Sequence, residues 1–465
     1  MGASSRTRRQ GRAVAAALLP LLAACSVSTP RNGVTVAANR ETGNGAASGV
    51  VVDAQTGEAL AAGRAAAPGP GSDGVAGGAD GVAATSTADA VVTEAAATAN
   101  QASAPGVTED RVVVSVIAGF SGPLAAMVTR AYDGLATWMD DVNESGGIHG
   151  RQVVLKKVDH KETADGGVAA CKEALSNGSF VAMVPEGVEA TLTAVSCLDA
   201  AGMPTFYYAP TVDPSWRYAF SNTPTSEQGG HQLASYVAGP LGGRGTKVGV
   251  VYVNQASYKA AADAFVPEAR RLGVDVAVVE AVEPNQASFA APLLRMQEAG
   301  VEIVVISATA EAIGIVRDAR SLGYDAAITG WGFQFDFITA AARDLFTGVT
   351  GLRGFAATDS AAFAQYAERM ATRGRGRDRV DDLEGFTAYG HGLTIGAVLW
   401  AAGQNPTRAS VVSGSESIRD FDNGVMAPFS WTPDDHVGVH GTFPIVCCND
   451  DYTWKTAGPP ATHHR

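Results

Sequence analysis

The sequence predicts an α/β fold of parallel sheets with helices on both faces, arranged as two lobes. Apolar, β-branched runs alternate with helical patterns along the chain after residue 107, which is typical of β-α-β units. Two such series are separated by a polar break at SNTPTSEQGG, residues 221–230. The 465 residues exceed what one compact core usually holds, so two or more domains are expected.

The N-terminus predicts export. Four arginines within residues 6–12 precede AVAAALLPLLAA, an apolar run too short to span a bilayer as a mature helix. The run ends in LAAC, which resembles a bacterial lipobox. We therefore expect residues 1–24 to be a lipoprotein signal peptide and Cys25 to be lipidated. This would anchor the protein at the extracytoplasmic face of the cell membrane. An ordinary signal peptide with a chance cysteine is the alternative.

A low-complexity segment follows Cys25. Residues 26–106 contain no Phe, Trp, Tyr, Lys or Met and are rich in Ala, Gly, Ser and Thr. Such a composition buries too little apolar surface to offset the entropy lost on ordering. We interpret residues 25–106 as a disordered tether between the lipid and the folded part.

The first β-α-β unit begins with the strand RVVVSVIA, residues 111–118. Ala131, Leu135 and Trp138 then recur at helical spacing, and the glycines of NESGG end that helix before the strand at residues 151–159. Further strands are predicted at residues 180–184, 205–209, 247–253, 274–282, 302–308 and 326–330. Helices are predicted at residues 257–272, 288–299 and 310–322, and a helix-rich portion at residues 360–412.

The composition excludes several classes of function. A net charge of −13 argues against a nucleic-acid partner, because phosphate binding needs a basic face. The chain has no G-x-S-x-G elbow, P-loop, CxxC or HExxH motif, so neither an enzyme nor a cofactor or metal site is predicted. His231 and His391 fall on predicted helices, where we interpret them as hydrogen-bonded or solvent-facing.

The cysteines point to structural bridges. An exported protein meets an oxidising environment, and Cys171 and Cys197 lie on neighbouring predicted helices, so we favour a disulfide between them. Cys447 and Cys448 are adjacent, which leaves either a vicinal disulfide or two free thiols.

Candidate ligand-binding residues lie in the loops after the predicted strands. In open α/β sheets, ligands bind outside the carboxyl ends of the strands. The residues are Phe120, Ser121, Glu186, Val188, Tyr208, Ala209, Pro210, Thr211, Tyr258, Ala308, Thr309, Trp331 and Phe333. For Trp331, Phe333 and Phe335, packing in the core is as well supported as a place in the cleft.

Several motifs together resemble a known family. GFSGPLAAM, NESGGIHGR, PTFYYAPT and NQASYKAAADAF occur in an order similar to that of the leucine/isoleucine/valine-binding protein family of ABC importers. That family belongs to the type I periplasmic binding proteins, and the resemblance covers about residues 107–455. It implies two Rossmann-like lobes joined by three hinge crossovers, near residues 221–230, 351–358 and 430–437. The implied lobes are residues 107–228 with 356–433, and residues 229–355 with 434–465.

The resemblance also implies a function. A monomer would close over a small solute and deliver it to the permease subunits of an ABC importer, without a cofactor. A ligand-sensing receptor of the same fold without a transport role is the alternative, and neighbouring permease genes or regulator genes would separate the two.

This sequence departs from the family at the amino-acid site. A serine that helps to hold the carboxylate falls on Val188, and a tyrosine and a glutamate that hold the ammonium fall on Ala308 and Gly332. Glu186 and Glu189 are candidates to replace the missing carboxylate. The expected ligand is an amino acid, an amide or an organic acid.

Overall fold

The computed structural model describes residues 33–36, 50–53, 59–60, 99–122, 124–186, 189–208, 213–375, 382–439, 441–448, 452–459 and 461–462. The signal peptide and five of the residues singled out above lie outside these ranges: Cys25, Val188, Ala209, Pro210 and Thr211.

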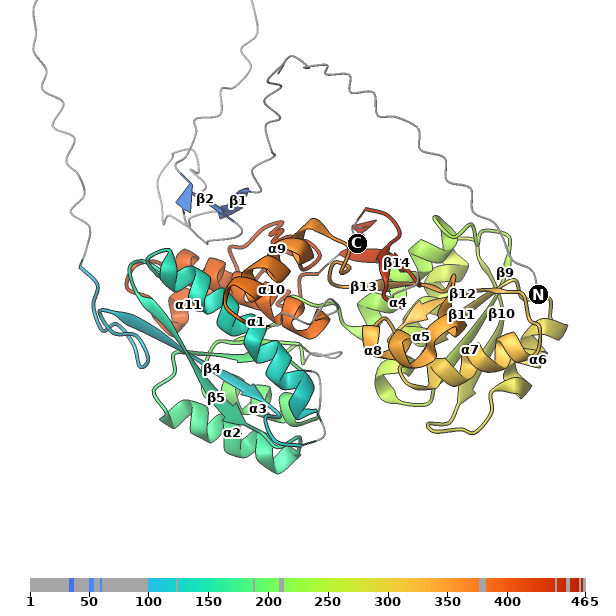
Figure 1. The fold of residues 1–465 in the computed structure, drawn as a ribbon, viewed down its shortest axis with the longest axis horizontal. Helices are drawn as coiled ribbons and strands as arrows, with labels where there is room; N and C mark the ends of the chain where they lie inside the picture. Colours follow the sequence, from blue (N-terminus) through green and yellow to red (C-terminus); the bar gives the residue numbers. More distant parts are fainter. Residues whose placement is uncertain are drawn as a thin grey trace, which may run out of the picture. The chain divides into compact units, whose positions relative to one another are not determined.

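The first sheet is parallel, with strand order β5-β4-β6-β7-β8. Figure 1 labels its neighbouring strands β4 and β5. Its elements follow the chain as β4 (Arg111–Ala118), α1 (Ala125–Glu144), β5 (Gln152–Asp159), α2 (Ala164–Ser176), β6 (Val181–Val184), α3 (Glu189–Ala200), β7 (Thr205–Tyr207) and β8 (Ala219–Phe220). Because β5 and β6 lie on opposite sides of β4, the chain reverses direction across the sheet there. The carboxyl ends of β4 and β6 thus form a topological switch point.

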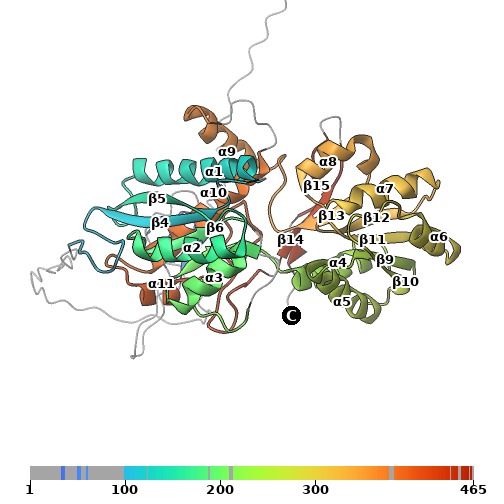
Figure 2. The same cartoon turned by 90° about the horizontal axis from the view of Figure 1, so that it is seen from below.

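Alternate residues of these strands enter two different cores. Val112, Val114 and Val116 of β4 pack with α1 and with α10 (Leu383–Ala401), whereas Ile117 packs with α2 and α3. Figure 2 shows α1 and α2 on opposite sides of the sheet. Burial on both faces explains why these strands read as continuous apolar runs.

The second sheet is also parallel, with strand order β10-β9-β11-β12. Its elements are α4 (Ser226–Ala238), β9 (Lys247–Val253), α5 (Ala256–Arg271), β10 (Asp275–Val282), α6 (Ala290–Glu298), β11 (Ile303–Ser307), α7 (Glu311–Ser321) and β12 (Ala327–Trp331). Val248 and Val250 pack on the side of α4 and α5, and Val251 and Val253 on the side of α6 and α7. The switch point of this sheet lies between β9 and β11. Both parallel sheets confirm the predicted fold class.

The C-terminal third supplies helices to the first core and a small antiparallel sheet. Its elements are α8 (Asp336–Ala342), the 3₁₀ turn η1 (Arg343–Phe346), β13 (Thr350–Arg353), α9 (Ala361–Thr372), α10, α11 (Arg408–Ser415), β14 (Gly441–Val446), β15 (Lys455–Thr456) and β16 (Ala461–Thr462). Strands β13, β15 and β16 all pair with β14. Phe429, Trp431 and Val439 are buried in the first core. The third crossover, in which the chain leaves the first lobe for the second, therefore follows Val439. The predicted position of this crossover was residues 430–437.

Helices α1 and α10 pack at backbone distance. A Cβ atom at Gly134 of α1 would collide with the carbonyl oxygen of Gly385 in α10. On the same interface, the indole of Trp138 lies against Gly392. Glycine is needed at such a close approach because any side chain would push the helices apart.

The folded part begins earlier than predicted. The side chain of Asn100 accepts a hydrogen bond from Arg151 at 2.9 Å and donates one to the carbonyl of Glu109 at 3.1 Å. The Gln101 N–H donates to the side chain of Asn405 at 2.9 Å. Residues 99–106, which we assigned to the tether, are thus fixed to the first lobe. The structure also describes three short antiparallel strands within the predicted tether: β1 (Gly33–Val36), β2 (Val50–Asp53) and β3 (Ala59–Leu60).

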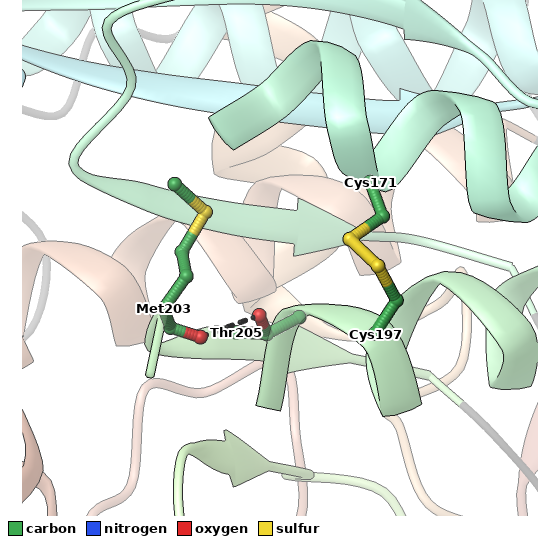
Figure 3. The surroundings of a disulfide bond; sticks show 4 residues. All are labelled: Cys171, Cys197, Met203 and Thr205. Atoms are coloured by element: carbon green, nitrogen blue, oxygen red, sulfur yellow. Dashed lines mark hydrogen bonds between the residues drawn. A yellow bond between two sulfur atoms is a disulfide. The ribbon is translucent and has the colours of Figure 1, made fainter. Parts of the chain in front are cut away.

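A disulfide joins α2 to α3, as predicted from the cysteine pattern. The sulfur atoms of Cys171 and Cys197 are bonded, with the Cα atoms 6.1 Å apart. Figure 3 shows the bridge beside Met203, whose carbonyl accepts a hydrogen bond from the Thr205 hydroxyl. Cys447 is joined to Cys448, the first of the two alternatives considered above.

Candidate functional site

Glu186 lies at the switch point of the first sheet. It follows β6, and its Oε1 accepts a hydrogen bond from the backbone N–H of Gly119, which follows β4. The side chain is also 2.9 Å from Nε2 of His160, the residue after β5. Glu186 is only 4% exposed and His160 is fully buried. Three consecutive loops of the sheet therefore meet at this one carboxylate.

The tautomer of His160 follows from its own hydrogen bonds. Its Nδ1 accepts from the backbone N–H of Glu162 at 3.1 Å, so the proton of the neutral ring is on Nε2, facing Glu186. The Nε2 and Oε1 atoms are close, but the contact lacks the geometry of a regular hydrogen bond. The second oxygen, Oε2, is buried and has no hydrogen-bond partner among the described residues.

Tyr258 and Thr309 occupy the switch point of the second sheet. Tyr258 is in α5, after β9, and Thr309 follows β11. The Tyr258 hydroxyl donates to Thr309 Oγ1 at 2.8 Å, and Thr309 Oγ1 donates to the Gly332 carbonyl at 2.6 Å. Desolvation raises the pKa of the Tyr258 phenol, so the group is a neutral hydroxyl at physiological pH.

Two cavities adjoin these residues and share Tyr208, Thr309, Phe335 and Phe355 in their linings. The first has a volume of about 240 Å³ and a mixed lining that includes Ser226, Ser257, Tyr258, Trp331, Gln334 and Arg353. The second has a volume of about 340 Å³ and is lined by Glu186 together with residues of α1 and α10. Volumes of this size suit small metabolites.

The predicted site residues divide into two groups. Glu186, Tyr208, Tyr258, Thr309 and Trp331 line one or both cavities. The structure brings these five together from loops that are up to about 145 residues apart in the sequence.

Four other candidates line neither cavity. Phe333 is fully buried against Phe346 and Trp454, with ring centroids 5.7 and 6.0 Å apart, and Ala308 is fully buried in the same core. Phe120 packs against Tyr132 and Lys157. Ser121 donates a hydrogen bond to Asp159 at 2.5 Å. Neither Phe120 nor Ser121 lines either cavity.

Sequence reasoning missed the contribution of α1 and α10. Leu124, which precedes α1, and Met127, Val128 and Ala131 of α1 line the second cavity, as do Leu383, Glu384, Thr387 and His391 of α10. Helix α10 is buried on nearly all sides. Its sequence therefore has no polar stripe from which the face toward the cavity could have been predicted. His391 is not solvent-facing: it is 3% exposed and lines the second cavity.

His391 makes the stability of the protein depend on pH. Burial lowers its pKa from 6.5 to about 3. As the pH falls below 6.5, this histidine binds a proton in the unfolded chain but stays neutral in the folded protein. Its contribution to the free energy of unfolding is therefore complete above pH 6.5 and is lost between pH 6.5 and 3. Acidification from pH 6.5 to 4.5 is expected to cost about 2 kcal/mol through this group.

Urea unfolding at the two pH values tests this expectation. The His391→Leu variant should lose about 2 kcal/mol less stability on acidification than the parent. His231→Gln, at an exposed position of α4, is the control and should behave like the parent. An equal loss in the parent and in His391→Leu would contradict the assignment.

The fold and the cavities together define a class of protein. Two doubly wound sheets, with residues from both switch points around adjoining cavities, are the architecture of the type I periplasmic binding proteins. A branched-chain amino acid ABC transporter protein from Thermus thermophilus, solved with bound valine, has a TM-score of 0.63 at 18% identity, covering 76% of this chain and 97% of that one. A fatty acid ABC transporter substrate-binding protein from Thermomonospora curvata has a TM-score of 0.63 at 19% identity, covering 77% and 94%.

The chain belongs to the periplasmic binding protein family, whose model matches residues 111–450. The Leu/Ile/Val-binding protein homolog 3 of Brucella melitensis is 27% identical over 224 residues, which is 47% of this chain and 60% of that relative. The chain thus spans about 60% of the length of the curated relatives that it matches. The motif-based resemblance to this family is confirmed.

Two further observations concern the described residues alone. None of their helices combines the length and the apolarity needed to cross a bilayer. Within the same ranges, no three His, Cys, Asp or Glu side chains gather in a way that could hold a metal ion.

Proposed function

We propose that the protein is an extracytoplasmic solute-binding protein, anchored through a lipid on Cys25, that delivers a small metabolite to an ABC importer. The observation that carries this proposal is the pair of adjoining cavities, where Glu186 from one sheet and Tyr258 and Thr309 from the other are brought together. Binding at residues of both sheets would favour the conformation in which the lobes close, because a ligand shifts a conformational equilibrium toward the state that it binds better.

The ligand class is proposed as amino acid, amide or organic acid. Two similar structures support this range, since one was solved with valine and another is described as a fatty acid transporter component. The hydroxyls of Tyr258 and Thr309 can bind carbonyl or carboxylate oxygens, and the aromatic rings of Phe335 and Phe355 suit an apolar portion.

A thermal-shift screen of the purified protein against amino acids, amides and organic acids tests the proposal. A ligand present at a hundred times its dissociation constant should stabilise the protein by about 2.7 kcal/mol. Tyr258→Ala should remove this stabilisation, since it deletes the ring and hydroxyl in the wall of the first cavity, together with the hydrogen bond to Thr309, which lines both cavities.

Tyr218→Ala is the matched control, because Tyr218 lines neither of these cavities. The stabilisation should persist in that variant. Chemical conversion of a bound solute, or the absence of binding to any member of the screen, would overturn the proposed function.

A further inference from the structure

The second cavity has an unusual combination of walls. Apolar side chains of Met127, Val128, Ala131, Leu383 and Phe355 surround much of it, yet the buried carboxylate of Glu186 is also in its lining. A carboxylate in an apolar, water-poor space is unfavourable unless it is paired and hydrogen-bonded. The balance of charge around this group therefore indicates what the cavity accepts.

The groups that face Glu186 compensate its charge only in part. Oε1 accepts from the Gly119 N–H and lies near the Nε2–H of His160, whereas Oε2 has no partner among the described residues. His391, which lines the cavity, is held in its neutral form by burial, which lowers its pKa to about 3. A neutral imidazole can exchange a hydrogen bond with a ligand but cannot neutralise a carboxylate.

The second carboxylate of the cavity is in a different position. Glu384 lies 3.1 Å from the guanidinium of Arg130, and Asp382, two residues earlier in the sequence, lies 4.0 Å from the same group. Glu384 is thus paired within the protein. Arg130 does not line the cavity. Glu186 is therefore the carboxylate of this cavity with an oxygen left for a ligand.

We propose that Glu186 binds the protonated amine of the solute, and that the apolar body of the solute lies between α1 and α10 in the second cavity. This inference rests on the proposed function and narrows it to amines with a sizeable apolar portion. Gly119 and His160 act as positioning residues, since they hold one carboxylate oxygen and leave the other for the ligand. The proposed amine site is on the first sheet. Ala308 and Gly332 of the second sheet, on which the family's ammonium-binding residues fall, carry no charge.

Three probes with the same apolar body and different head groups test the proposal: 2-phenylethylamine, 2-phenylethanol and 3-phenylpropanoate. Calorimetry should show that the parent protein prefers the amine to the anion. Glu186→Gln should weaken amine binding at least tenfold and leave binding of the alcohol nearly unchanged. Glu189→Gln, at an exposed position three residues away, is the matched control and should bind all three probes like the parent.

A second pair of variants guards against misfolding of Glu186→Gln. Met127→Trp fills the cavity from α1 and should abolish amine binding with Glu186 still in place. Thr129→Trp, on the exposed side of the same helix, should not affect amine binding. Melting curves of all variants establish that they are folded.

The possible outcomes separate this inference from the function on which it rests. Equal amine affinity in the parent and in Glu186→Gln, tighter binding of 3-phenylpropanoate than of the amine, or binding of none of the three probes would overturn the inference. If the parent still binds another solute of the wider screen, the proposed function stands. A parent protein that binds nothing in either experiment would refute both.

Discussion

Replacing Trp431 by alanine is expected to lower the free energy of unfolding by about 3–5 kcal/mol. The side chain is fully buried, and its ring centroid lies 4.7 Å from that of Phe429 and 5.2 Å from that of Phe220. Its indole N–H donates to the carbonyl of Ser221 at 2.9 Å. The substitution would leave a large cavity and a buried carbonyl without its donor, and both effects destabilise the protein.

Urea unfolding of Trp431→Ala, Trp431→Phe and a control variant separates the loss of ring packing from the loss of the indole hydrogen bond. Trp431→Phe keeps most of the ring packing and removes the donor, so a loss of about 1–2 kcal/mol is expected. Trp400→Ala, at a half-buried position near the end of α10, is the control and should cost less than Trp431→Ala. A loss below about 1 kcal/mol for Trp431→Ala would show that the residues around Trp431 are not a tightly packed core.

Asp141→Ala is expected to cost about 3–5 kcal/mol of stability. This carboxylate is 7% exposed and accepts hydrogen bonds from Arg369 of α9 and from the Tyr389 hydroxyl of α10, each at 2.9 Å. It also lies 2.5 Å from the guanidinium of Arg373. The substitution leaves Arg369 without its carboxylate partner and the buried Tyr389 hydroxyl without its acceptor, whereas Arg373 keeps Glu144 and Asp140. Removing one partner of a largely buried ion pair is the costly way to break it.

The neighbouring residue provides the control. Asp140 is 30% exposed and lies 2.7 Å from Arg375. Because exposed ion pairs contribute little, Asp140→Ala should cost less than about 1 kcal/mol. Equal losses for Asp140→Ala and Asp141→Ala in urea unfolding would mean that burial does not set the strength of the Asp141 interactions.

Elements with a strong local signal were predicted well. The strands at residues 111–118 and 247–253 have the predicted bounds, and the helix predicted at residues 310–322 is observed as Glu311–Ser321. Long apolar runs and helical spacing are local properties of the sequence, so such strands and helices can be predicted without knowledge of the tertiary fold.

Features that depend on distant residues were not predictable in this way. Residues 99–106 have the small, polar composition of a tether, yet Ser103 donates a hydrogen bond to the carbonyl of Pro406, about 300 residues away. The ambiguity at Phe333 had a similar origin, because only the structure shows that β12 ends at Trp331 and that the chain then turns Phe333 into the core. Helix α10 carries four cavity residues, but its sequence is apolar on almost every side.

The shared core of α1 and α10 has a consequence for the timing of biosynthesis. About 240 residues separate the end of α1 at Glu144 from the start of α10 at Leu383. At typical ribosome speeds of about 5–20 residues per second, α10 is synthesised on the order of ten to fifty seconds after α1. The apolar face of α1 cannot pack against α10 before then. During that interval the nascent chain exposes an aggregation-prone surface, so a chaperone that shields this stretch would raise the yield of folded protein.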